Sequence, residues 1–242
     1  MRLLIVRHGD PDYEKDSLTE KGWREAALLA ERISKLDVAA FYVSPLGRAR
    51  DTASLTLEKM GRTAVECSWL REFWPGIIRP DAGGRETQAW DWLPEDWTSR
   101  EEFFGRDTWR ENPVMCQGGV GEAWQTAAEG LDVLLAEHGY VREGYLYRAQ
   151  RPNRDTVVLF CHFGVECVLL SHLMNVSPMI LWHHTCALPT SVTTAITEER
   201  RQGKVAFRVN AFGDISHLYA GGEEPSFSAR FCETFDSDER HD

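Results

Sequence analysis

The chain has 242 residues, of which 43% are hydrophobic, and this suits one large soluble domain or one domain with an insertion. Its formal net charge of −11 argues against nucleic acid or an anionic membrane as the main partner, but it allows a local basic pocket. No stretch approaches roughly 18 consecutive apolar residues and the first residues lack a signal-peptide core, so we expect a cytoplasmic protein.

The first strand is predicted over residues 3–6, a short aliphatic run typical of a strand buried on both faces. Gly9 and Pro11 prevent its continuation, so Arg7 and His8 stand where a core strand ends. Open α/β sheets bind ligands beyond the carboxyl ends of their strands, which makes Arg7 and His8 candidate site residues.

A helix follows, with Thr19 as its predicted N-cap and with apolar positions recurring at helical spacing through residue 36. We expect these positions to cover the sheet: Trp23, Ala26, Ala27, Ala30 and Ile33. A second buried strand is predicted over residues 38–43. Ser44 and Pro45 are then predicted as an N-cap and the first position of a helix that ends near Met60.

The rest of the chain continues the alternation of strands and helices. Short or buried strands are predicted at 63–69 and 156–162, helices at 121–139 and 164–174, and a hairpin at 190–212 that turns near Gln202 and Gly203. The alternation predicts an α/β fold, a three-layer α/β/α sandwich around a mostly parallel mixed sheet.

Residues from about 73 to 120 break this pattern and are interpreted as an insertion within a single domain spanning residues 1–242. The insertion holds five of the nine tryptophans: Trp74, Trp90, Trp92, Trp97 and Trp109. They are expected to form local core, although an aromatic insertion could also cap a pocket and select the leaving group. The charged chain from about residue 233 is expected to fray.

Cysteines and paired histidines give no metal signal. The six cysteines form no C-x-x-C pair, and several lie in apolar runs, so we expect reduced thiols at Cys67, Cys116, Cys161, Cys167, Cys186 and Cys232. His183 and His184 could suggest a metal, but without a partner at ligand spacing they are interpreted as packing or surface residues.

A cation or an imidazole follows the end of a predicted strand at three separate places. These are Arg7 with His8, Arg48 one turn into the second helix, and His162 after the strand at 156–162. If those strands are neighbours, two guanidinium groups, two imidazoles and a helix N-terminus converge, which describes a phosphate site. An imidazole there could also attack phosphorus.

These residues resemble the histidine phosphatase superfamily in its phosphoglycerate-mutase-like branch. In family order, RHGD resembles the Arg-His-Gly signature, LTEKG the opening of the first helix, and SPLGRARDTA the second motif. LREF resembles the acid motif, GGVGEAW the next helix start, and FCHFGV the second histidine motif. The matches span most of the chain, so the resemblance implies a phosphoglycerate-mutase-like fold.

The resemblance implies a role for each matched residue. His8 is the nucleophile that forms a phosphohistidine, Arg7, Arg48 and His162 hold the phosphoryl oxygens, and Glu72 donates a proton. Fixed donors would then meet the developing charge, so no metal and no cofactor are expected. Asp81, Glu86 and Asp91 lie in the same unpatterned region and remain alternatives to Glu72.

Three departures from the family pattern bear on the reaction. Phe163 follows the second histidine, where a small residue is usual, and Pro11 to Tyr13 replace a Thr-x-x-Asn stretch. FWPGII after Glu72 lacks the Arg-His-Tyr-Gly run of cofactor-dependent mutases. We therefore expect a phosphomonoester hydrolase acting on a small-molecule ester. A phosphoglycerate-type mutase and a non-catalytic phospholigand-binding module are the alternatives, and the sequence does not set the oligomeric state.

Overall fold

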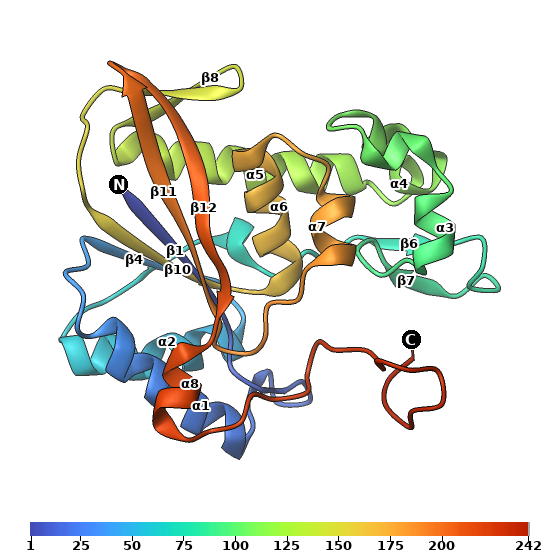
Figure 1. The fold of residues 1–242 in the computed structure, drawn as a ribbon, viewed down its shortest axis with the longest axis horizontal. Helices are drawn as coiled ribbons and strands as arrows, with labels where there is room; N and C mark the ends of the chain where they lie inside the picture. Colours follow the sequence, from blue (N-terminus) through green and yellow to red (C-terminus); the bar gives the residue numbers. More distant parts are fainter. Residues whose placement is uncertain (242) are drawn as a thin grey trace.

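The computed structural model describes residues 1–241 and is built around one eight-stranded mixed sheet (Figure 1). In spatial order its strands are β5 (Val65–Glu66), β4 (Ala40–Val43), β10 (Thr156–Cys161), β1 (Arg2–Arg7), β11 (Val192–Arg201), β12 (Lys204–Asp214), β9 (Leu146–Ala149) and β8 (Tyr140–Glu143). Parallel ladders join β5, β4, β10 and β1, and the ladders from β1 to β8 are antiparallel. The predicted mixed sheet is confirmed, but it is not mostly parallel, because only three of its seven ladders are parallel and these lie in one half.

The two central strands set the position of the candidate residues. In the parallel ladder between β1 and β10, Arg7 pairs with Cys161. The next residues along the two strands are His8 and His162, and the amide of His8 donates to the carbonyl of Cys161 at 3.0 Å. Both imidazoles therefore leave the sheet at the same edge.

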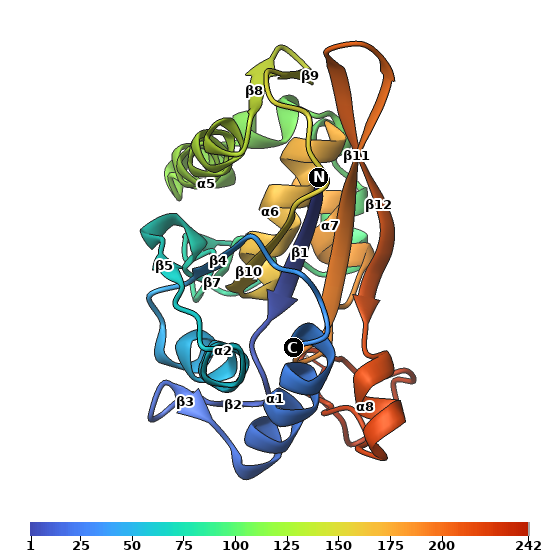
Figure 2. The same ribbon diagram turned by 90° about the vertical axis from the view of Figure 1, so that its left-hand side faces the viewer.

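Helices cover both faces of the sheet, which confirms the three-layer architecture (Figures 1 and 2). Leu3 and Ile5 of β1 join a core with α5 (Val120–Glu137) and α6 (Phe163–Met174). Leu4 and Val6 point to the other face and pack with α1 (Glu20–Ile33) and α2 (Gly47–Met60). β1 is thus buried on both sides, as its unbroken apolar run predicts.

The buried face of α1 differs from the predicted one. Ala26, Ala30 and Ile33 are buried as expected, but Trp23 is 37% exposed and Ala27 is also exposed. Glu25 is buried instead, because its carboxylate accepts hydrogen bonds from the backbone amides of Asp10 and Ser226 at 2.9 and 3.3 Å. Burial raises the pKa of Glu25 to about 7. The buried face of α1 therefore includes a carboxylate that accepts from two backbone amides, and it leaves out two of the apolar side chains that were predicted to be buried.

The start of α2 also corrects a prediction. Pro45 is not helical, and Ser44 does not cap the helix, whose N-cap is Leu46 without a side-chain bond. The Ser44 hydroxyl instead pairs with Nε2 of His162 at 2.7 Å. By contrast, Thr19 caps α1 as predicted, accepting from the Gly22 amide. The Ser44 hydroxyl does form a hydrogen bond, but its partner is the side chain of His162, which is distant in the sequence.

Several short elements were not predicted. They are β2 (Pro11–Asp12), β3 (Ser17–Leu18), the hairpin of β8 and β9, a 3₁₀ helix (Ser68–Leu70), α7 (Pro178–His184) and α8 (Ser216–Gly221). The predicted hairpin at 190–212 is confirmed by β11 and β12, which turn at Gly203 with φ of +74°. Within residues 1–241, no helix is long and apolar enough to cross a membrane.

The region at 73–120 folds into short pieces beside α5 and α7. These are β6 (Gly76–Ile78), β7 (Glu86–Gln88), α3 (Pro94–Thr98), 3₁₀ helices at Glu101–Phe104 and Thr108–Glu111, and α4 (Pro113–Gln117). Trp92, Trp97 and Trp109 are buried, as expected of local core, whereas Trp74 is 47% exposed and Trp90 is partly exposed, and both line the pocket described below. The indole of Trp109 packs against those of Trp124 in α5 and Trp182 in α7, with centroids 6.3 and 6.0 Å apart.

The C-terminal tail, residues 222–241, crosses back over the first loop of the chain. The hydroxyls of Ser226 and Ser228 both donate to the carboxylate of Asp10, the latter at 2.6 Å. Asp10 also accepts from Thr19 at 2.7 Å. The tail is therefore bound to Asp10, which lies two residues after His8 in the sequence. Fraying from about residue 233 stays a prediction.

The packing of Trp109 predicts that the 73–120 region folds cooperatively with the rest of the molecule. Trp109→Ala should lower the free energy of unfolding by about 3–5 kcal/mol, because a fully buried indole would leave a cavity between α5 and α7. Denaturant titration followed by circular dichroism measures this loss. Trp74→Ala is the matched control, with a cost of roughly 1 kcal/mol or less because Trp74 is 47% exposed. A separate early transition confined to the Trp109 variant would contradict one cooperative unit.

Candidate active site

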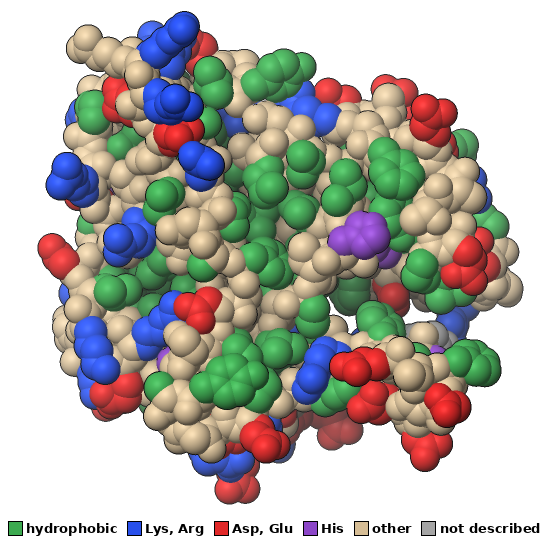
Figure 3. Space-filling model, in the orientation of Figure 1, with side chains coloured by type: hydrophobic (Ala, Val, Ile, Leu, Met, Phe, Trp, Pro, Cys, Tyr) green, Lys and Arg blue, Asp and Glu red, His purple; other side chains and the backbone are tan. Residues whose placement is uncertain are grey.

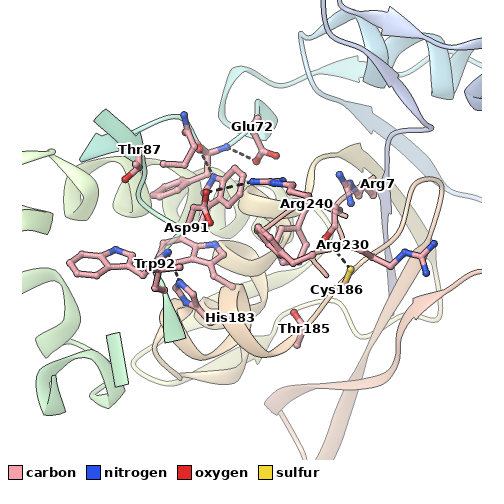
Figure 4. A pocket seen from close by; sticks show the side chains of 18 of the residues that line it. Arg7, Glu72, Thr87, Asp91, Trp92, His183, Thr185, Cys186, Arg230 and Arg240 are labelled. Atoms are coloured by element: carbon pink, nitrogen blue, oxygen red, sulfur yellow. Dashed lines mark hydrogen bonds and ion pairs between the residues drawn. The ribbon is translucent and has the colours of Figure 1, made fainter. Parts of the chain in front are cut away.

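A pocket of about 1080 Å³ opens at the edge of the sheet where β1 and β10 end. Its walls come from the loops after β1 and β4, from the 73–120 region, from α7 and from the C-terminal tail. The surface is hollowed between the 73–120 region and the tail (Figure 3). Figure 4 shows Arg7, Glu72 and Arg230, from three distant parts of the chain, around this one space.

His8 is buried beside the pocket, with 1% of its surface exposed. Its Nδ1 lies 2.7 Å from the carbonyl oxygen of Gly9. A carbonyl can only accept, so Nδ1 carries the proton and Nε2 keeps its lone pair. Burial, reinforced by the charges of Arg7 and Arg48, holds the pKa of His8 well below 6.5. The side chain is thus a neutral imidazole with a defined free nitrogen.

His162 lies next to His8, with the two ring centroids 5.1 Å apart. It precedes the first turn of α6, and its Nε2 pairs with the Ser44 hydroxyl. Its Nδ1 is buried and has no hydrogen-bond partner among residues 1–241. Burial, followed by the nearness of the His8 imidazole and the charge of Arg48, lowers the pKa of His162 well below 6.5. Both imidazoles are therefore neutral in the free protein.

Two arginines face the pocket, Arg7 from the end of β1 and Arg48 from the first turn of α2. Arg7 donates to the carbonyl oxygen of Ala187 at 2.5 Å, and Arg48 forms an ion pair with Asp16 at 2.6 Å. Asp16 also accepts from the Gly47 amide at 2.7 Å. A Cβ at position 47 would lie 2.0 Å from the carbonyl oxygen of Asp16, so only glycine permits this approach. The Nε atoms of both arginines are buried and unpartnered in the described chain.

Glu72 lines the same pocket, from the loop that follows the 3₁₀ helix at Ser68–Leu70. Its Oε1 accepts from the amides of Phe73 and Val165 at 2.7 and 3.2 Å, so Oε2 is the oxygen that can carry a proton. Burial raises the pKa of Glu72, against the lowering effect of those amides and of the arginines. Gly164 permits the contact, since a Cβ there would lie 2.6 Å from Oε1.

The alternative acids are less well placed. Asp91 lines the pocket and pairs with Arg240 at 3.6 Å, whereas Asp81 pairs with Arg79 at 2.9 Å. Neither Asp81 nor Glu86 is among the residues that line the pocket. The geometry therefore favours Glu72, with Asp91 as the alternative within reach.

His183 is a packing residue, as interpreted from the sequence. Its Nδ1 lies 2.7 Å from the Met179 carbonyl oxygen, and its Nε2 accepts from the Trp92 amide at 3.1 Å. Its ring stacks on Trp97, and burial lowers its pKa to about 4. Both ring nitrogens are already engaged by backbone groups. In the described chain, no group of three or more His, Cys, Asp or Glu residues is arranged to hold a metal ion.

Several residues at the site were not predicted from the sequence to belong to it. Ser44 holds His162, Arg71 lines the pocket beside Glu72, and Arg230 enters from the tail. Glu166, one turn into α6, is fully buried, and burial raises its pKa to about 8. Arg71 belongs to the acid motif LREF, and this position could have indicated that it lines the pocket. Nothing in the local sequence pattern predicts that the tail returns with Arg230.

Comparison with known proteins agrees with this arrangement. The model of the histidine phosphatase superfamily, branch 1, matches residues 3–210. A probable phosphatase of Schizosaccharomyces pombe is 25% identical over 90% of this chain and 95% of its own length. A probable phosphoglycerate mutase of Serratia proteamaculans is 32% identical, but over 32% of this chain and 40% of its own length. The match thus spans less than half the length of that mutase.

Solved structures share the fold over nearly the whole chain. A phosphoserine phosphatase variant from Entamoeba histolytica, in complex with phosphoserine, aligns with a TM-score of 0.60 at 19% identity, covering 90% of this chain and 98% of that one. A Bacillus stearothermophilus protein, YhfR, aligns with a TM-score of 0.57 at 22% identity, covering 90% and 98% of the two chains. The family model, the ordered motifs and the fold agree: the chain belongs to the histidine phosphatase superfamily, in its phosphoglycerate-mutase-like branch.

Proposed function

We propose that this protein hydrolyses phosphate monoesters through a phosphohistidine on His8. The observation that carries the proposal is the fixed state of His8: its Nδ1 proton is bound to the Gly9 carbonyl, and its neutral Nε2 is free to attack. A nucleophile needs an available lone pair and neighbouring charges to receive its electrophile. Arg7 and Arg48 supply those charges on either side.

In the proposed first step, Nε2 of His8 forms a bond to phosphorus and the bond from phosphorus to the ester oxygen breaks. Arg7, Arg48 and His162 bind the phosphoryl oxygens, and Oε2 of Glu72 gives its proton to the leaving oxygen. Water then attacks phosphorus, the bond from phosphorus to Nε2 breaks and its electron pair returns to His8, Glu72 takes up a proton from that water, and inorganic phosphate leaves. His8 returns to its neutral form.

Two observations support hydrolysis over mutase activity. The phosphatase relative matches 90% of this chain, whereas the mutase relative of Serratia proteamaculans matches 32%. The sequence after Glu72 also lacks the Arg-His-Tyr-Gly run expected of cofactor-dependent mutases. We further propose that residues 1–242 form one domain, in which the 73–120 region caps the pocket over a small-molecule ester.

The nucleophile assignment predicts that His8→Ala loses at least roughly 10³-fold in kcat, since no other group would form the covalent intermediate. During turnover the wild type should carry acid-labile, base-stable phosphate, and the variant should carry none. Rapid-quench labelling measures this, with far-UV circular dichroism as the check on folding. Labelling of His8→Ala at the wild-type rate would contradict the assignment. A wild type that binds phosphate esters without ever being labelled would indicate a non-catalytic binding module.

The general-acid assignment predicts a leaving-group effect. Glu72→Gln should slow cleavage of an alkyl phosphate by about 10²–10⁴-fold and cleavage of a nitrophenyl phosphate much less, because nitrophenolate leaves without a proton. Single-turnover measurements isolate this step.

The kcat/KM of the wild type should rise with pH as His8 deprotonates, through a pKa below 6.5, and fall as Glu72 deprotonates, through a pKa above 4.5. The Glu72→Gln variant should lose only the part of this profile that falls with pH. Asp91→Asn is the control and should keep the whole profile. Equal losses on both esters would make Glu72 a positioning residue.

The charge at the site also predicts that turnover continues in the presence of a chelator. Arg7, Arg48 and the first turn of α6 already present positive charge and donors to a phosphoryl group. Phosphate release should be unchanged after incubation with EDTA and dialysis against metal-free buffer. Complete loss of turnover that one divalent ion restores would contradict the proposed chemistry.

A further inference from the structure

The pocket holds more positive charge than one phosphoryl group requires. Seven arginines line it against three carboxylates, in a chain whose formal net charge is −11. Arg7 and Arg48 flank His8, so five arginines remain: Arg71, Arg79, Arg85, Arg230 and Arg240. A strongly acidic protein that gathers cations in one cavity favours a ligand with further negative charge.

The contacts of four of these arginines distinguish them. Arg79 pairs with Asp81 and Arg240 with Asp91. Arg230 donates to the Ser226 carbonyl and lies over the ring of Phe227, which turns its guanidinium toward the tail. Arg71 is exposed and lies 5.0 Å over the indole of Trp74. Within residues 1–241, no carboxylate lies within ion-pair distance of Arg71.

Arg71 lines the same pocket as Arg7, Arg48 and Glu72. Its charge is among those that lower the pKa of His162. It directly precedes Glu72, the proposed proton donor to the leaving oxygen. Because Arg7 and Arg48 already serve the phosphoryl site, a cation beside the proposed proton donor is available to the leaving group.

Aromatic rings line the space beside the phosphate site. Phe163 directly follows His162, where the family usually has a small residue, and its partly exposed ring faces the pocket. The indole of Trp90 stands edge-on to Phe163, with centroids 6.5 Å apart. Such rings bind the faces and edges of other aromatic rings better than saturated groups of the same size.

From this arrangement, and resting on the proposed function, we infer that the preferred substrate has an aromatic leaving group that carries a second negative charge. The ring packs against Phe163 and Trp90, and the charge binds the guanidinium of Arg71. Arg71 and Phe163 are thus assigned as residues that determine specificity.

Four matched esters test this inference: benzyl phosphate, cyclohexylmethyl phosphate, and each of these with a para carboxylate. Their leaving groups are all primary alkoxides, so chemical reactivity hardly varies, whereas ring type and charge do. Binding of the four phosphonate analogues, measured by calorimetry, reports recognition without turnover. The wild type should bind the carboxylated compounds about tenfold more tightly, and the aromatic compounds about two- to tenfold more tightly.

Variants assign these preferences to residues. Arg71→Gln should reduce the carboxylate preference to about one, and Phe163→Leu should do the same to the aromatic preference. Arg50→Gln is the matched control, since it removes a positive charge that pairs with Glu66 outside the pocket, and it should keep both preferences. A wild type without either preference, or an Arg71→Gln variant that weakens all four compounds equally, would overturn the inference.

Phosphate release from the four esters separates this inference from the proposed function. Selective binding without release from any ester would support the inference and reject hydrolysis. Release from all four at equal kcat/KM, with equal binding of the phosphonates, would support hydrolysis and reject the inference.

Discussion

The parallel pairing of β1 with β10 is the constraint on which the site depends. Because Arg7 is in register with Cys161, the residues that follow, His8 and His162, emerge side by side although 153 positions separate them in the sequence. The same strands are buried on both faces, so their register is set by two apolar cores at once. The position of the imidazoles is therefore as firmly determined as the core itself.

Burial then gives those imidazoles their chemical character. An imidazole in water is half protonated near pH 6.5, but here lost solvation and neighbouring guanidinium groups favour the neutral form. The same burial acts in the opposite sense on Glu72 and favours its protonated form. One desolvated space thus favours neutral imidazoles and a protonated carboxyl together, and backbone groups of Gly9, Phe73 and Val165 determine which atoms of His8 and Glu72 stay free.

Much of this could be predicted from the sequence, because the relevant signals are local. The apolar run before Arg7 and the alternation of strands with helices indicate the layers, and the ordered motifs indicate Arg48, Glu72 and His162. Long-range partners leave no such signal. Ser44 looks like a helix cap until His162 is placed beside it, and Glu25 looks exposed until the Asp10 and Ser226 amides are found around it. The path of the 73–120 region, without periodicity, could not be derived from residue patterns.

The alternation of side chains in β1 has a consequence for how the molecule can change. Deleting one residue among Leu3 to Val6 would exchange the side chains that face the two cores and would move His8 along the strand. The length of β1 therefore cannot change without disrupting both cores. The turn between β6 and β7 is different, because Gly83 and Gly84 have open space around them. Insertions in that turn would reshape a pocket wall while Arg7, His8 and His162 stay in register. The shape of the pocket can therefore change by loop length alone, in evolution or in a library, while the residues at the ends of β1 and β10 keep their positions.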